Sequence, residues 1–167
     1  MSATTVERFC DSLERVGAGW TTAAPADVEA VLDDLVRDPA VGVPLDVDGT
    51  DLPADVDTDP SPVDLEAAAT GVTRARGAIA DYGSLVLEST PAGEEAASLF
   101  VEHHVAVVRE SDVRETMADA LDALGPVLRD GGSAVLATGP SATADMGDLV
   151  QGAHGPETVD VVVVEGR

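Results

Sequence analysis

The sequence predicts a single α/β domain in which a Rossmann-like, mostly parallel sheet is flanked by helices. Two observations lead to this prediction. Apolar, β-branched runs alternate with amphipathic segments along the chain, the pattern of strands that crossover helices bury on both faces. The length of 167 residues suits one core and leaves no room for a second full domain.

Residues 1–40 are predicted to form an N-terminal helical region. Apolar residues between Val6 and Val16 recur at spacings of three and four, and Gly17 ends this first helix. Pro25 opens a second helix, which closes before Pro39.

The middle of the chain begins with a β-branched run over residues 41–47, which predicts the first strand. Residues 48–62 hold several Asp and three Pro with little apolar material, so we expect an acidic, solvated loop. A short helix is expected over residues 63–70.

The same signals predict the remaining elements. Residues 77–88 are predicted to form either two strands joined by a tight bend at Asp81 to Gly83 or one strand broken by a bulge at Gly83. The elements that follow are a helix from Thr90 to Leu99, a strand from His103 to Val108, a helix capped by Ser111, a strand from Ala134 to Thr138 and a final strand from Val159 to Val164.

The strand that ends at Thr138 is followed by Gly139 and Pro140 and then by hydroxyl residues. This pattern predicts a tight loop into a helix N-terminus, where backbone amides attract an anion. Gly139, Ser141 and Thr143 are therefore the candidate ligand-binding residues, although the two hydroxyls suit helix capping equally well. Asp145 would lie in the first helical turn, as a catalytic base or as a partner of the helix dipole.

Two further residues are catalytic candidates. His154 lies between glycines, and it could act as an acid or base near neutral pH or stabilise a turn. Asp81 lies at the strand bend, which can present a carboxylate to a cleft, although Asp is also a common turn residue. His103 and His104 are adjacent on a predicted strand and so point to opposite faces. They do not form a joint metal site, and we predict no metal in this chain.

The charge balance excludes several partner classes. The chain has 32 acidic and nine basic residues, all nine of them Arg, for a net charge of −23. Such a chain repels nucleic acid and anionic membranes. The acids are dispersed and 44% of residues are apolar, which favours a folded, salt-adapted protein from a halophilic, archaeon-like source.

Cysteine content and the N-terminus indicate the compartment. Cys10 is the single cysteine, so an intrachain disulfide or a cysteine-bound iron–sulfur cluster cannot form here. No signal peptide or membrane-length apolar run is visible, and we expect a cytoplasmic protein. Any redox centre of its system would belong to another chain.

Three blocks of residues resemble a known family over positions 70–164. They are Thr70-Gly71-Val72 continuing through Asp81-Tyr82-Gly83 to Leu87, Ser98-Leu99 continuing through His104 to Val108, and Gly139-Pro140-Ser141 continuing through Gly152-Ala153-His154-Gly155-Pro156. With these blocks the chain resembles the LUD-domain family, in its lactate utilization protein C branch. One departure is Ala142, which stands where family members usually carry Arg.

The resemblance implies a fold shared with sugar-phosphate isomerases, CoA transferases and formyltetrahydrofolate cyclo-ligases. It also implies an accessory role in oxidising L-lactate to pyruvate, beside partner proteins that hold the iron–sulfur clusters, with no cofactor in this chain. Two alternatives remain open. The chain could be a small-molecule enzyme that uses Asp81, Asp145 or His154, or a ligand-sensing domain without catalysis.

Overall fold

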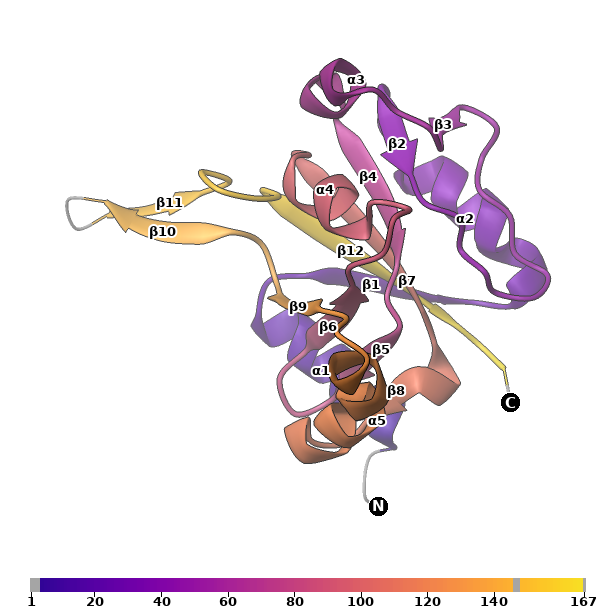
Figure 1. Cartoon of the computed structure of the whole chain (residues 1–167), viewed down its shortest axis with the longest axis vertical. Helices are drawn as coiled ribbons and strands as arrows, with labels where there is room; N and C mark the ends of the chain where they lie inside the picture. Colours follow the sequence, from indigo (N-terminus) through magenta and orange to yellow (C-terminus); the bar gives the residue numbers. More distant parts are fainter. Residues whose placement is uncertain (1–3, 146–147, 167) are drawn as a thin grey trace.

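The computed structural model describes residues 4–145 and 148–166, and its centre is a sheet of six parallel strands (Figure 1). Their spatial order is β1-β12-β7-β4-β2-β3. The strands are β1 (Gly19–Ala23), β2 (Ala40–Gly42), β3 (Val56–Asp57), β4 (Thr70–Arg74), β7 (His103–Arg109) and β12 (Thr158–Val164). The predicted α/β class with a mostly parallel sheet is thus confirmed.

One face of this sheet is covered by helix α2 (Val28–Leu35), which follows the 3-10 turn η1 (Pro25–Asp27). Val28 and Leu32 of this helix are fully buried and pack against alternate valines of the central strands. Because side chains alternate between the faces of a strand, the other valines of β7 and β12 point to the opposite face.

That opposite face packs against helices α1 (Thr5–Arg15) and α4 (Glu94–Leu99) and against a second sheet. The second sheet has the order β8-β5-β6-β9. Its strands are β5 (Gly77–Ile79), β6 (Ser84–Glu88), β8 (Val113–Arg114) and β9 (Ala134–Thr138). Helix α5 (Met117–Arg129) covers its outer face through Ala120, which packs on Ile79 and Val86. The cover on this side is therefore part helix and part sheet.

The segment after Gly139 differs from its prediction. No helix begins there; the chain forms β10 (Ala142–Asp145), which pairs antiparallel with β11 (Asp148–Gln151). This hairpin projects from the body of the protein (Figure 1). Ser, Ala, Thr and Ala alternate polar and small residues with a period of two, and that period suits a strand better than a helix.

Several other predicted element boundaries differ from those in the structure. The strand predicted over residues 41–47 is only Ala40–Gly42 (β2), and helix α3 spans Pro62–Ala67, so Thr70 begins β4 instead of ending a helix. Besides the hairpin, strands β1, β3, β4 and β8 were not predicted. Helix α5 is capped by Thr116 and not by Ser111, because the 3-10 turn η2 (Glu110–Asp112) and β8 intervene.

Candidate functional site

A cavity of about 230 Å³ lies at the amino ends of β7 and β12, beneath the base of the hairpin. Every block of the family resemblance contributes to its wall. The lining residues are Leu85, Ser98, Leu99, His104, Val135, Leu136, Ala137, Thr138, Gly139, Pro140, Ser141, His154, Gly155, Pro156 and Val159. Segments that are far apart in the sequence therefore meet at one place.

His104 is the buried ionisable residue in the wall of this cavity. His104 is only 1% exposed, and its Nε2 lies 2.8 Å from Oγ1 of Thr73 on the neighbouring strand β4. Burial, followed by the charge of His103, lowers the pKa of His104 to about 4. The imidazole is therefore neutral near pH 7, with one nitrogen as a hydrogen-bond donor and the other as an acceptor.

The Gly139 turn closes one side of the cavity. Gly139 has a φ of +63°, and a Cβ there would lie 2.4 Å from the carbonyl oxygen of Val16 at the end of α1. Only glycine combines this left-handed backbone with such a close approach. The turn is therefore fixed by its contact with α1.

Ser141 ties the hairpin to the loop that carries His154. Its N–H donates to the carbonyl oxygen of Pro156 at 2.8 Å, and its carbonyl oxygen accepts from the N–H of Gly152 at 2.9 Å. The Ser141 amide is thus occupied within the protein. Because no helix begins here either, the predicted anion pocket of free amides at a helix N-terminus is not formed.

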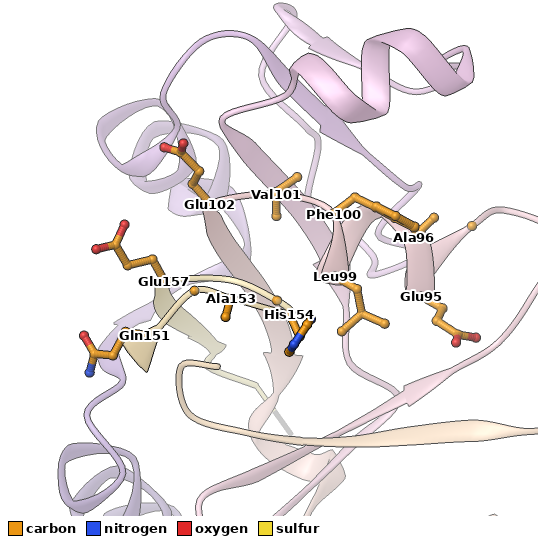
Figure 2. A pocket seen from close by; sticks show the side chains of 13 residues that line it. Glu95, Ala96, Leu99, Phe100, Val101, Glu102, Gln151, Ala153, His154 and Glu157 are labelled. Atoms are coloured by element: carbon orange, nitrogen blue, oxygen red, sulfur yellow. The ribbon is translucent and has the colours of Figure 1, made fainter. Parts of the chain in front are cut away.

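His154 lies between this cavity and a larger outer hollow. The outer hollow, about 920 Å³, lies between α4 and the end of β11, and Leu99, His154 and Gly155 line both spaces. In Figure 2 the exposed His154 ring lies beside Leu99, with Phe100 further along the same wall. His104 and His154, 50 residues apart in the sequence, thus line the same inner cavity.

The entrance is acidic. Glu95, Glu102 and Glu157 line the outer hollow (Figure 2), and the described residues around either space include no Arg. A small anion would meet repulsion here and find no guanidinium. The arrangement favours a neutral or cationic group over an anion.

The other candidates lie elsewhere. Thr143 is on β10 of the hairpin and does not line the cavity. Asp145 was expected in a helical turn, but its backbone ends β10; its side chain lies outside the described part of the structure. Asp81 lies in the turn between β5 and β6, where it forms an ion pair with Arg8 of α1. The same Arg8 also pairs with Glu115, so Asp81 helps to attach α1.

His103 and His104 point to opposite faces of β7, as the alternation of strand side chains predicts. His103 Nε2 lies 2.8 Å from Oδ2 of Asp160 on β12, whereas His104 contacts Thr73. Asp160, the single polar interruption of the last strand, thus serves as the partner of a buried imidazole. Among the residues that the structure describes, no group of three or more His, Cys, Asp or Glu could hold a metal ion.

The model of the LUD domain matches residues 62–164. This chain belongs to the LUD-domain family. The match includes every residue that lines the inner cavity, from Leu85 to Val159.

Relatives of known name agree with this assignment. The chain is 29% identical to a Lactate utilization protein C of Deinococcus radiodurans, over 95% of this chain and 79% of that protein. Proteins of the same name from Bacillus velezensis and Bacillus licheniformis are 31% and 35% identical over 61% of this chain. These matches cover 44% and 45% of the two Bacillus proteins, less than half of their lengths.

A solved structure shows the same fold. The crystal structure of a DUF162 family protein from Deinococcus radiodurans superimposes with a TM-score of 0.75 and 24% identity, over 98% of this chain and 99% of that one. In the described part of this LUD-domain protein, no helix has the length and apolar character that crossing a membrane requires.

His104 lines the cavity but is not among the catalytic or ligand-binding residues predicted from the sequence, where it enters only with His103 as an excluded metal pair. The available signal was its position at the start of an otherwise apolar strand, within a block that resembles the family. A histidine that is buried there needs a hydrogen-bond partner, and Thr73 supplies it.

Proposed function

We propose that this LUD-domain protein is an accessory component of a system that oxidises L-lactate to pyruvate, and that iron–sulfur proteins are its partners. The observation that supports this most directly is the convergence of the three family blocks on one cavity lined by His104 and His154. The names of the Deinococcus and Bacillus relatives point to the same pathway.

The chemistry of the chain favours an accessory role. Its single cysteine, Cys10, is buried, and one thiolate does not provide the ligand set of an iron–sulfur cluster. The acidic entrance disfavours free lactate as the occupant of the cavity. We therefore assign electron transfer to the partners and assign to this chain a neutral ligand or an assembly contact.

Co-purification tests this proposal. The full chain, tagged and expressed from its own locus in cells grown on lactate, should bring with it proteins that contain iron and acid-labile sulfide. Repeated purifications that recover no such protein would count against the accessory role. Growth on glucose is the control condition, because a lactate-specific assembly should be reduced there.

A second candidate function is catalysis on a small molecule, and one observation favours it. Two imidazoles line one cavity, and the buried one is neutral and hydrogen-bonded. Neutral imidazoles serve as general acids and bases. Under this alternative, turnover of a small-molecule substrate would fall at least tenfold in His154→Ala, whereas Thr143→Ala on the hairpin would retain it.

We also propose that the protein works in a cytoplasm of high salt concentration. The support is the net charge of −23 with Arg as the only basic residue type. The three named relatives come from bacteria, so the proposal concerns the salt concentration and does not depend on an archaeal source.

A further inference from the structure

Three arginine side chains converge at the carboxyl ends of two adjacent central strands. Arg74 ends β4 and Arg109 ends β7, and Arg76 follows two residues after Arg74. All three contact Asp46, which lies in the loop after β2. This is the end of the parallel sheet opposite to the cavity lined by His104.

These contacts occupy only a few of the N–H donors of the three arginines. Nη1 of Arg74 and Nη2 of Arg109 each donate to the carbonyl oxygen of Asp46 at 2.8 Å. The carboxylate contacts are longer, at 3.4 Å from Arg76 to Asp46, 3.9 Å from Arg74 to Asp112 and 4.0 Å from Arg76 to Glu88. Each guanidinium carries five N–H groups, so most of these donors do not face a close carboxylate oxygen.

Arg74 gives the clearest indication that the three arginines lack a close anionic partner. It is only 8% exposed, and its Nε is buried without a hydrogen bond. Burial, followed by the charges of Arg76 and Arg109, lowers the pKa of Arg74, and the carboxylates of Asp112 and Asp46 offset this only in part. A buried guanidinium crowded by two others is costly unless an anion compensates it. This chain has nine arginines in all, and three of them are gathered here.

Asp46 holds the cluster in an unusual way. Its φ is +47°, the single positive φ at a non-glycine residue among those described. A left-handed backbone is uncommon at such a residue, and here it directs a carbonyl oxygen at two guanidinium groups. A neutral carbonyl oxygen occupies the position where a charged oxygen would bind more strongly.

We propose that Arg74, Arg76 and Arg109 form a binding site for the phosphate or carboxylate group of a small ligand, which replaces Asp46 as their partner. The site lies beyond the carboxyl ends of parallel strands, where open α/β sheets bind ligands. Two cavities flank it, one of about 170 Å³ that Arg109 lines and one of about 140 Å³ that Arg76 lines. The proposal does not depend on the lactate-related function.

Calorimetric titration of the full chain tests the site. Inorganic phosphate in one arm and pyruvate in the other are titrated at constant ionic strength in potassium chloride. We expect phosphate to bind, and Arg76→Gln and Arg109→Gln each to weaken its binding about tenfold, the effect of losing one charge-assisted hydrogen bond. Asp46→Asn should tighten binding severalfold, because Asn tolerates the left-handed backbone and removes the competing carboxylate.

Arg37→Gln is the matched control. Arg37 is exposed, and its backbone N–H contacts Thr70 at the opposite end of β4, so its loss removes the same charge without touching the site. Equal weakening in Arg37→Gln would show a general charge effect and overturn the proposal. Absence of binding in both arms would also overturn it, as would unchanged affinity in the folded Arg76 and Arg109 variants. Pyruvate binding that exceeds phosphate binding and requires these arginines would assign the site to carboxylates.

Discussion

His104 and Thr73 lie on neighbouring parallel strands and are joined by a hydrogen bond of 2.8 Å between Nε2 and Oγ1. The register pairs His104 with Gly71, so Thr73 lies two residues further along the same face of β4. The hydroxyl thus reaches the imidazole diagonally across the sheet, and the histidine stays buried and neutral at the wall of the cavity.

This burial makes the folded protein sensitive to acid. The pKa of His104 falls from 6.5 to about 4, so below pH 6.5 the unfolded chain binds a proton that the folded chain excludes. Stability is therefore complete above pH 6.5 and decreases as the pH falls toward 4, by about 3 kcal/mol from this residue. Between pH 6.5 and 4, the free energy of unfolding in urea should fall by about 3 kcal/mol more for the wild type than for His104→Gln. A constant difference between the two proteins would contradict the neutral, buried histidine.

High salt should stabilise the fold. The net charge of −23 produces repulsion that screening relieves, and the Debye length falls to roughly 3 Å at 1 M. Urea unfolding in increasing KCl should show a free energy of unfolding that rises most steeply at low concentrations. Sucrose at equal osmolality is the control, and a flat KCl response would argue against the proposed saline cytoplasm.

The cap of helix α5 gives a direct comparison of two hydroxyl residues. Thr116 Oγ1 accepts from the N–H of Asp119, and the Asp119 side chain accepts in return from the N–H of Thr116. Thr116→Ala should lower the free energy of unfolding by about 1 kcal/mol. Ser111→Ala should change it by less than about 0.5 kcal/mol, since exposed positions away from caps rarely matter. Equal losses of stability in the two variants, measured by thermal unfolding, would contradict the assignment of Thr116 as the N-cap of α5.

The Gly139 turn should not tolerate a side chain. In Gly139→Ala the new Cβ meets both a left-handed backbone and the carbonyl oxygen of Val16 at 2.4 Å, and we expect a loss of about 2–3 kcal/mol. Gly131 also has a positive φ, but nothing lies within 4 Å of its Cβ position. Gly131→Ala should therefore lose only about 1 kcal/mol, and chemical denaturation of the two variants would show whether the contact with α1 adds the rest.

The sequence predicts the long, strongly patterned elements well. The strand Ala134–Thr138 lies where it was expected, and β7 and β12 extend their predicted ranges by one residue each. The apolar run of β12 is longer than any nearby pattern that would favour a helix or a turn. Strand β1 was missed because Gly19, Trp20 and two threonines carry no apolar run, and its pairing with β12 determines its structure. Tertiary pairing of this kind overrides local propensity.

The site was harder to predict than the fold. Gly139, Ser141 and His154 do meet at one cavity, because the family block places them in one loop and hairpin. The anion chemistry assigned to that loop depended on a helix that does not form. The arginine cluster had no sequence signal, because Arg74 and Arg109 are 35 residues apart and meet only through the pairing of β4 with β7.

Strand β7 links the two ends of the molecule. His104 stands near its first residue and Arg109 is its last, so about 16 Å of extended chain separates them. The four residues between them are fully buried. A ligand at the proposed arginine site would therefore not touch a ligand in the His104 cavity, and the two sites would fill independently of each other.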